Sequence, residues 1–484
     1  MPDDNQSDMV AEDTPVIPHY SQPSGDSKLH HDLTWAYVAS GAKIASAAFV
    51  AGLLFRRAGA AEFAMFALIR GTIGVLNYTS LGLAPAMVRL LAEAMAQSHP
   101  DAVLPTELQA EAIPPRPRPA GLSERSVYAN GVSVAALSLG LGLVLTLLYS
   151  HWFDRLHRVP PGIPDVALVV VWIGLGTLMR LFSDSSGAVL QTRGRIALDN
   201  KLLASAELVW IISLLLCGAR AIAHREPTLL VIAAFAYAIA GCYLAFVRAF
   251  VVSRLTQSPW PPSKSLVKWD VIGRLAAFGV LVLFAQLADY LYAPTDYILI
   301  NRLLDPNLVA TYAPAVQIDA GLLMLVSGLA AVLLPRAAIA HTTGSTQAVV
   351  HYYIRGTLAS AAMLIIAAFG VYAISPWLFH VWFGAAPPNT RAILPLVLIH
   401  TVVGGSSAVG RSILLAMGKV SAFTVSTLTA GAINVAASYC FVHYLHLGLE
   451  GIIFGTIIAV IGRCALWMPW YVVRTLRKEL AANA

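Results

Sequence analysis

Residues 34–55 read TWAYVASGAKIASAAFVAGLLF, residues 56–62 read RRAGAAE, and residues 63–88 read FAMFALIRGTIGVLNYTSLGLAPAMV. The first and third segments are predominantly apolar. As helices that rise about 1.5 Å per residue, both can cross the hydrocarbon layer of a bilayer, which is about 30 Å thick. The charged segment between them is short enough to be a turn. This stretch therefore predicts two membrane-spanning helices joined at one face of a bilayer.

The composition of the chain is that of a polytopic membrane protein. Of its 484 residues, 57% are hydrophobic and 12% are charged, and its mean hydropathy is +0.69. These values and the apolar runs predict an all-α polytopic membrane protein with about 12 transmembrane helices. The net charge of +6 does not indicate a nucleic-acid partner in such a chain. The predicted spans cover residues 34–55, 63–88, 127–150, 164–187, 202–220, 228–252, 274–300, 307–335, 352–375, 390–416, 421–442 and 449–473, and the tenth contains a break near Gly404 and Gly405.

The spans fall into two lobes of six helices, separated by a linker that reads SRLTQSPWPPSKSLVKWDVIG. This linker is basic and interrupted by prolines, so it is either a solvated connection or a segment on the inner membrane surface. A long Pro-rich loop interrupts the first lobe on the cytoplasmic side. The predicted regions are a disordered cytoplasmic tail at 1–33, an N-lobe at 34–252 with its loop at 94–126, the linker at 253–273, a C-lobe at 274–473 and a cytoplasmic tail at 474–484.

The placement of Lys and Arg predicts the orientation in the membrane. With the N-terminus in the cytoplasm, eighteen of the 32 cations fall on the cytoplasmic side, eight fall outside and six lie within the runs. Cytoplasmic loops of membrane proteins carry the excess of Lys and Arg. We therefore expect both termini to lie in the cytoplasm.

The two lobes are expected to be structural repeats around a central cavity. A shift of 246 positions (302 minus 56) aligns Arg56 with Arg302 and Phe66 with Tyr312 without a gap. The arginine at the turn and the aromatic residue ten positions later favour this register. Pseudo-symmetric lobes are typical of transporters, in which the ligand binds between the repeats near the middle of the membrane.

A cation lies well inside each of the first two runs, Lys43 in one and Arg70 in the other. A cation at this depth costs roughly 3 kcal/mol or more unless it faces protein or water. Snorkelling to the interface is the alternative, but Lys43 lies about 13 Å from the start of its run at helical rise. Ser40, Lys43 and Ser46 recur on one helical face, as do Arg70 and Asn77. We therefore predict that Lys43, Arg70 and Asn77 line a polar cavity.

The C-lobe carries acidic residues next to tyrosines. Asp289 and Asp296 lie seven positions apart with Tyr292 between them, and Tyr312 and Asp319 have the same spacing in the next run. Residues seven positions apart lie on one helical face. These faces suit sugar hydroxyls, which Tyr292 and Tyr312 could bind, or a coupling ion at the three aspartates. Hydrogen bonding between helices is the alternative.

The other charges within the runs have local explanations. Arg180 and Asp184 are four residues apart, which predicts an ion pair within one helix. Arg248 lies near the inner end of its run and is interpreted as a positive-inside anchor, and Glu207 is expected to pair with the nearby Lys201. The four cysteines lie in apolar runs without CxxC spacing. We expect no metal site, no cofactor and no catalytic residue.

Two stretches resemble a known family. The first helix–turn–helix, GLLFRRAGAAEFAMFAL at 52–68, and the start of the second lobe, DYILINRLLDPNLVATYAPAVQI at 296–318, resemble the polysaccharide transporters, the Wzx-type flippases of lipid-linked oligosaccharides. The resemblance extends over about 34–473 and matches the family's twelve helices. The chain departs from the family pattern at Ala64, where a glycine is usual, at residues 58–60, where Leu-Gly-Pro is usual, and in the length of its 94–126 loop.

The resemblance implies the protein's cargo and its location. Members of the family move undecaprenyl pyrophosphate that carries a short glycan across the bacterial inner membrane, for the synthesis of O-antigen, capsule or exopolysaccharide. Lys43 and Arg70 suit the diphosphate, because desolvated cations can replace its hydration. The expected partners are the lipid-linked glycan, membrane lipids, and neighbouring polysaccharide polymerases or glycosyltransferases. The protein is expected to be a monomer.

Two other functions are open at this stage. The first is a proton- or sodium-coupled multidrug extruder of the same superfamily, which would need acidic residues as the dominant charges of its first lobe. The second is a polytopic glycosyltransferase or polymerase. Such an enzyme usually has a large external loop with an acidic catalytic group, and the predicted external loops here are short.

The repeat also suggests a latch between the lobes. The 246-residue register that aligns Arg56 with Arg302 places Lys43 opposite Asp289. Pairing would offset part of the cost of holding each charge in the membrane. An entering diphosphate would compete for Lys43 and leave Asp289 available for a proton.

The predicted orientation has a direct test. A reporter that is active only in the periplasm should be silent when fused after Ala484 and active when fused near Pro160, because the cation distribution places these positions on opposite sides. The reverse pattern of activity would overturn the orientation.

Overall fold

The computed structural model describes residues 25–74, 76, 83–98, 123–163, 165–256, 261–276, 293–342, 346–384, 389–417 and 419–483. Within these ranges the regular structure is helical and contains no strand. Ten described segments are long and apolar enough to cross a membrane. The predicted class, an all-α polytopic membrane protein, is confirmed.

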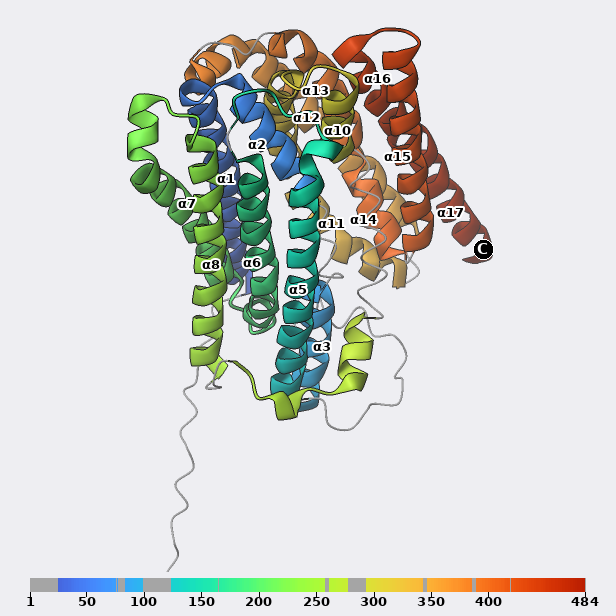
Figure 1. Ribbon diagram of the computed structural model, residues 1–484. Coiled ribbons are helices and arrows are strands. Elements are labelled where there is room, and N and C mark those ends of the chain that lie inside the picture. Colours follow the sequence, from blue (N-terminus) through green and yellow to red (C-terminus); the bar gives the residue numbers. More distant parts are fainter. Residues whose placement is uncertain are drawn as a thin grey trace, which may run out of the picture.

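The first half of the chain forms one group of helices, which we call the N-lobe (Figure 1). Its helices α6 and α8 pack against each other, and both contact α7. The N-lobe consists of α1 (Gly25–Arg57), α2 (Ala60–Ile73), α3 (Leu83–Ser98), α5 (Glu124–Leu156), α6 (Val166–Thr192), α7 (Ile196–His224) and α8 (Leu229–Thr256).

The second half forms the C-lobe, drawn in yellow to red in Figure 1. A π-helical segment separates its last two α-helices. The C-lobe consists of α10 (Ala293–Leu303), α11 (Leu308–Thr342), α12 (Thr346–Phe383), α13 (Thr390–Ser406), α14 (Ala408–Ala416), α15 (Val420–His443), α16 (Gly448–Val460), the π-helix Ile461–Trp467 and α17 (Met468–Asn483).

The helix ends differ from the predicted spans in several places. Helix α1 begins at Gly25, so part of the predicted 1–33 tail is helical. Helix α12 extends beyond the predicted run at both ends, and α17 continues past residue 473. The tenth predicted span is broken at Ser407, close to the expected position.

Glycines set the close approach of α6 and α8. A Cβ atom at Gly241 of α8 would lie 2.5 Å from the carbonyl oxygen of Gly176 on α6, and one at Gly176 would lie 2.6 Å from the ring of Tyr237. Small residues let membrane helices approach with their backbones nearly in contact. The position of Tyr237 in the N-lobe is therefore fixed by backbone packing.

The linker between the lobes is attached to the start of α5. Asn130 Nδ2 donates to the carbonyl of Leu266 at 3.1 Å, and the amide of Lys268 donates to Asn130 Oδ1 at 2.8 Å. Ser126 Oγ donates to the same Leu266 carbonyl. This part of the linker is therefore held against the N-lobe rather than free in solution.

The lobes contact each other through α1 and α2 on one side and α10, α11 and α12 on the other. At the end of α1, Arg56 donates to the carbonyls of His380, Val381 and Trp382 near the end of α12. Trp382 Nε1 in turn donates to the carbonyl of Ala48 at 2.6 Å. Terminal helix carbonyls lack intrahelical partners and attract cations. These contacts close one end of the interface, which we call the closed end.

The C-lobe makes the equivalent contact in the other direction. At the end of α10, Arg302 Nη2 donates to the carbonyl of Arg155 near the end of α5, at 3.3 Å. Next to it, Asn301 and Arg158 exchange two hydrogen bonds of 2.9 Å. Arg56 and Arg302 thus each cap a helix of the opposite lobe, which supports the 246-residue register between the repeats.

His157, at the end of α5, is buried at this closed end. Its Nε2 lies 2.8 Å from the hydroxyl of Tyr149, which donates to Thr72. Burial, together with the positive charge of Arg302, lowers the pKa of His157 from 6.5 to about 4. The closed end is therefore built around a neutral imidazole.

The stability of the protein should consequently depend on pH. Because the unfolded chain takes up a proton at His157 below about pH 6.5 and the folded chain only below about 4, the free energy of unfolding should fall as the pH decreases through this window. Thermal unfolding of the purified protein in detergent should show this decrease, and the His157→Gln variant should show a smaller one. Equal pH dependence in the two proteins would contradict this account.

Candidate binding site

The N-lobe holds a cluster of cations around one aromatic side chain. Arg70 of α2 lies with its guanidinium carbon 4.9 Å from the ring centre of Trp210 on α7 and 5.6 Å from that of Tyr237 on α8. Trp210 is fully buried and donates its Nε1 hydrogen to the carbonyl of Ala233. Cation–π contacts of this kind offset part of the cost of removing the cation from water. Arg70 itself is only partly buried.

Arg180 of α6 approaches the same tyrosine. Its guanidinium carbon lies 4.7 Å from the ring centre of Tyr237, and its Nη1 donates to Glu207 on α7 at 2.6 Å. Glu207 also accepts a 2.5 Å hydrogen bond from Ser46 of α1. The Nε and Nη2 atoms of Arg180 are buried and have no hydrogen-bond partner in the described part of the chain. Two donors of this guanidinium are thus available for a further acceptor.

Lys43 of α1 completes the cluster. Its side chain is exposed, although it lies in the middle of a membrane-spanning helix. Its charge acts on Tyr237 and on Asp184, which belong to α8 and α6. Lys43 is therefore within electrostatic reach of α6 and α8 of its own lobe. We call Lys43, Arg70 and Arg180, together with Tyr237 and Glu207, the N-lobe cation cluster.

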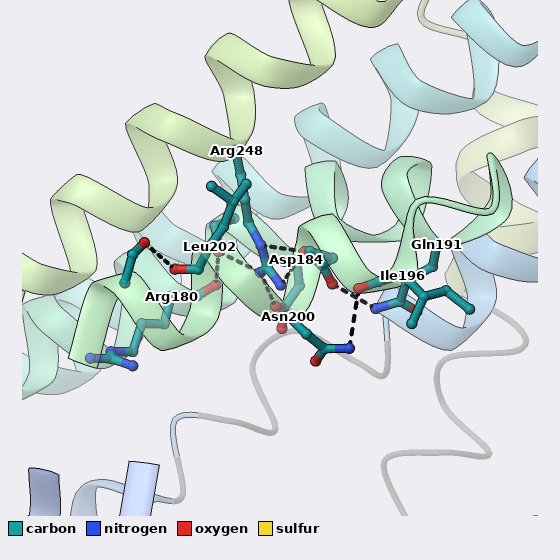
Figure 2. Close-up of polar contacts among 10 residues, drawn as sticks. Arg180, Asp184, Gln191, Ile196, Asn200, Leu202 and Arg248 are labelled. Carbon is teal, nitrogen blue, oxygen red and sulfur yellow. Dashed lines mark hydrogen bonds and ion pairs between the residues drawn. The ribbon is translucent and has the colours of Figure 1, made fainter. Parts of the chain in front are cut away.

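The prediction of an ion pair between Arg180 and Asp184 is wrong. Asp184 bonds instead to Arg248 of α8 at 3.0 Å, and Arg248 also bonds to Asp199 of α7 at 2.7 Å. Figure 2 shows the guanidinium of Arg180 pointing away from Asp184, and Arg248 reaching toward it. The two residues are close on one helix, but each side chain finds a better partner on a neighbouring helix.

Two related interpretations are also corrected. Arg248 is not an anchor at the membrane surface, because its side chain is only 3% exposed and lies within this ion network. Glu207 does not pair with Lys201; Lys201 lies over the ring of Trp35 at 4.6 Å. A buried charge needs both a partner and further hydrogen bonds, and Arg248 has these from Ser183 as well as from the two aspartates.

Asp296 of the C-lobe lies at the centre of a sealed polar cluster. Its side chain is fully buried and accepts hydrogen bonds from Tyr312 at 2.8 Å, Asn434 at 3.1 Å and Thr456 at 2.8 Å. Ser438 extends the cluster by bonding to Asn434. Because Tyr312 donates its hydrogen to Asp296, that hydrogen is not available to a sugar. Several oxygen atoms converge here, which suits a proton or a hard cation.

Asp319 lies in a different environment. Its Oδ1 accepts a 2.6 Å hydrogen bond from Thr401 of α13, and its charge interacts with that of His400. Tyr297 of α10 lies 5.6 Å from the ring of Tyr312, between ring centres, and packs on Gly71 of α2 in the N-lobe. Gly71 permits this contact, since a Cβ at that position would lie 2.7 Å from the Tyr297 ring.

Three of the sequence-predicted residues lie outside the described residues: Asn77, Asp289 and Tyr292. Their roles, and the latch between Lys43 and Asp289, remain predictions. Arg70 lies over the ring of Tyr237, and the charge of Lys43 acts on the same side chain. Asp296 and Asp319 lie in two separate C-lobe environments, and Tyr312 belongs to the first of them.

Sequence reasoning missed several members of these sites. The spacing of Arg180 and of Glu207 predicts local pairs, although an ionisable residue inside a span indicates a functional site by default. The same rule would have identified His400 in the tenth span. Tyr237, Asn434 and Thr456 carry no such signal, because uncharged polar residues in membrane helices commonly serve only helix packing.

Comparisons with known proteins agree with this architecture. No family model matches the chain. The "Uncharacterized membrane protein EpsK" of Bacillus subtilis (strain 168) is 24% identical over 357 residues, which cover 72% of this chain and 68% of that protein.

Solved structures give the fold. The inward-facing conformation of a multidrug resistance MATE family transporter of the MOP superfamily has a TM-score of 0.68 at 14% identity, covering 91% of this chain and 96% of the other. The outward-facing conformation of such a transporter gives 0.57 at 14% identity, covering 93% and 96%. The chain therefore has the fold of the MATE transporters.

The pair between Arg180 and Glu207 should matter for stability. Replacing Glu207 by Leu leaves the partly buried Arg180 without its partner, which should cost about 3–5 kcal/mol. Thermal unfolding of the purified protein should therefore shift to lower temperature in Glu207→Leu, and less in the double variant Arg180→Met with Glu207→Leu.

A matched control is available in the same lobe. Glu226 pairs with Arg220 at 3.5 Å, but the side chain of Arg220 is 84% exposed. Glu226→Leu should change stability by less than about 1 kcal/mol. If Glu207→Leu is no more destabilising than this control, the buried pair does not hold the N-lobe cation cluster together.

Proposed function

We propose that this protein is a flippase that moves an undecaprenyl-pyrophosphate-linked oligosaccharide from the cytoplasmic to the periplasmic leaflet of the bacterial inner membrane. The glycan would serve the synthesis of O-antigen, capsule or exopolysaccharide. One observation carries the proposal: Arg70 and Arg180, from two different helices, lie near the ring of Tyr237 in the membrane-spanning part of the N-lobe, and the charge of Lys43 from a third helix acts on the same side chain. The MATE-type fold of the chain supports a transporter rather than an enzyme.

The chemistry of the cluster favours a diphosphate. A diphosphate offers several oxygen acceptors and more than one negative charge, and an arginine fork binds such groups with two parallel hydrogen bonds. Arg180 has two buried nitrogen atoms available for this purpose. Lys43 adds an exposed point charge. Together these cations would replace the water that the head group loses on leaving the cytoplasmic leaflet.

Glu207 gives the cluster a way to release its cargo. It occupies one nitrogen of Arg180 and is held in place by Ser46. A flippase must bind its cargo and then let it go. An internal carboxylate that competes for the arginine would limit the affinity and would recapture Arg180 when the cargo leaves.

The arrangement of the lobes fits the first half of a transport cycle, in which the periplasmic end of the interface is still closed. The observed contacts between the lobes close one end of the interface, the end where Arg56 and Arg302 cap opposing helices. With both termini in the cytoplasm, this is the periplasmic end. Membrane potential would favour export, because each negative charge that leaves an inside-negative cell gains about 2.3 kcal/mol per 100 mV.

Coupling to an ion is proposed for the C-lobe aspartates. Asp296 is sealed among neutral donors and could exchange its hydrogen bonds for a proton or Na⁺. Asp289 and Asp319 are the further candidates from the sequence. The environments of Asp296 and Asp319 differ from those of Asp184 and Asp199 in the N-lobe, which are bonded to Arg248.

A multidrug extruder is the second candidate, because solved structures of that function share the fold. Extrusion of cationic drugs would require accessible acidic residues. Three described acids within the N-lobe spans, Glu207, Asp184 and Asp199, are each bonded to an arginine. The charge of the cluster thus favours an anionic cargo.

The proposal is tested by charge removal. Arg70→Ala and Arg180→Ala should each reduce export of the lipid-linked oligosaccharide by about tenfold or more, since a hydrogen bond to a charged group contributes about 1.5–3 kcal/mol. The cargo should accumulate on the inner leaflet while the amount of Arg70→Ala protein in the membrane stays normal. Arg180→Ala leaves the buried Glu207 without its partner, so its export is compared per amount of folded protein. Arg70→Lys should restore only part of the export, because lysine lacks the fork.

Arg254→Ala is the matched control. Arg254 stacks on Phe250 at the end of α8 and lies outside the N-lobe cation cluster. Full export by Arg254→Ala is expected. Full export by both Arg70→Ala and Arg180→Ala would overturn the proposed role of the cluster.

A further inference from the structure

Three arginines line one pocket at the closed end. Arg56 and Arg57 are the last residues of α1, and Arg225 is the residue that follows α7. The pocket lies where the two lobes meet and has a volume of about 430 Å³, which is within the range of small-ligand sites. Its lining residues are Phe55, Arg56, Arg57 and Arg225 of the N-lobe and Phe383 and Gly384 of the C-lobe.

The charge of this pocket is unbalanced. Only eight of the 32 cations are predicted to lie outside, and three of them meet here, with no carboxylate among the described lining residues. Glu226, the neighbour of Arg225 in the chain, pairs with Arg220 at 3.5 Å, and Glu62 Oε2 lies against Gly59. Like charges repel one another, and a cleft lined by one sign of charge attracts the opposite sign. The pocket is therefore complementary to an anion.

The arginines also have hydrogen-bond donors that the protein does not use. Arg56 donates to α12 through Nε and Nη2, and its Nη1 has no hydrogen-bond partner in the described part of the chain. Arg57 and Arg225 are exposed and make no side-chain hydrogen bond or ion pair with the residues that the structure describes. An arginine fork binds phosphate oxygens with two parallel hydrogen bonds. The unused donors thus suit a phosphate group.

The backbone of Arg225 gives a second, independent indication. Its φ of 56° lies in the left-handed region, at the C-cap of α7, where glycine is favoured. A side chain at such a position costs conformational free energy that glycine avoids, and strained positions are concentrated at functional sites. An arginine at this position is explained by what its side chain can bind.

We propose that this pocket, which we call the arginine pocket, binds a phosphate group and that the bound phosphate stabilises the closed end. The group belongs either to the head group of an anionic phospholipid or to inorganic phosphate. Phe55 and Phe383, whose ring centres lie 5.1 Å apart, form an apolar part of the wall that the carbon atoms of a lipid can contact. Binding is non-covalent, and no bond is made or broken.

The complete pocket exists only while the lobes are in contact at this end. Arg56 is held in place by the carbonyls of His380, Val381 and Trp382 in the C-lobe. Separation of the lobes would release Arg56 and remove Phe383 from the wall. A ligand that binds one conformation more tightly shifts the equilibrium toward it. A bound phosphate should therefore favour the closed end, whatever cargo the protein carries.

Binding is measured by calorimetry on the purified protein in a neutral detergent, at constant ionic strength. The probes are inorganic phosphate and dihexanoyl phosphatidylglycerol, with the zwitterionic dihexanoyl phosphatidylcholine as reference. We expect saturable binding of at least one of the two anions and weaker binding of the reference lipid. Binding of phosphatidylglycerol alone identifies a lipid head group as the source, and binding of inorganic phosphate identifies the free anion. Absence of saturable binding of both anions would overturn the proposal.

Two pocket variants and one control locate the binding. Arg57→Ala and Arg225→Gly should each weaken the affinity about tenfold or more, because each removes hydrogen bonds to a charged group. Arg225→Gly suits the left-handed backbone, so it remains informative if Arg57→Ala does not fold. Arg391→Ala is the control, since Arg391 is exposed, lies over Tyr372 at 5.9 Å and does not line the pocket. Unchanged affinity in both pocket variants, or an equal loss in the control, would overturn the proposal.

Arg70→Ala separates this site from the N-lobe cation cluster. The affinity of the arginine pocket for phosphate should be unchanged in this variant, because Arg70 does not line the pocket. Loss of binding in Arg70→Ala with full binding in Arg57→Ala and Arg225→Gly would mean that the anion binds at the N-lobe cation cluster. That result would overturn the arginine pocket and leave the proposed transport function standing.

The effect on the closed end is measured by electron–electron double resonance. Spin labels are attached to Ile196→Cys and Gln347→Cys, exposed positions at the starts of α7 and α12, after replacement of the four native cysteines. Addition of the anion that binds should increase the population in which these positions are far apart and the closed end is in contact. Arg225→Gly should show no such increase. A distance distribution that stays the same when the anion is bound to the parent protein would overturn the stabilising role.

Discussion

The high cost of a charge inside the membrane governs the arrangement of polar residues in this protein. A cation at mid-membrane is tolerated only when protein or water replaces bulk solvent. Arg248 meets this requirement with two aspartates and a serine. Arg70 meets it with the faces of Trp210 and Tyr237. Arg180 meets it only in part, because two of its nitrogen atoms are unsatisfied in the described part of the chain. The contrast between Arg248 and Arg180 separates a structural charge from one that is available to a ligand.

The same reasoning connects the two lobes. Arg56 and Arg302, which the predicted repeat aligns, each donate to carbonyls near the end of a helix in the other lobe. These hydrogen bonds are made to exposed helix ends, where water can compete, so they can break and re-form at modest cost. The N-lobe cation cluster and the Asp296 cluster lie away from this closed end. A closed end made of such exchangeable contacts, combined with charged sites deeper in the membrane, is what alternating access requires.

The sequence was informative about the spans and about Lys43 and Arg70, because hydropathy and misplaced charges are properties of single helices. The sequence was misleading for side chains that can pair either with a residue on their own helix or with a residue on an adjacent helix. Asp184 lies four residues from Arg180, yet it bonds to Arg248. That choice depends on how α6 is rotated against α8, which the contact between Gly176 and Gly241 determines. Neutral members such as Asn434 and Thr456 were missed because their importance comes only from the buried Asp296 between them.

The central claim is that the N-lobe cation cluster binds an anionic lipid head group. The most direct measurement is the affinity of the purified protein for a short-chain polyprenyl diphosphate, compared with the matching monophosphate and with a quaternary ammonium compound, by calorimetry in detergent. We expect the diphosphate to bind most tightly, with an affinity that decreases as salt concentration rises. Preferential binding of the quaternary ammonium compound, or equal binding of diphosphate and monophosphate, would contradict the claim.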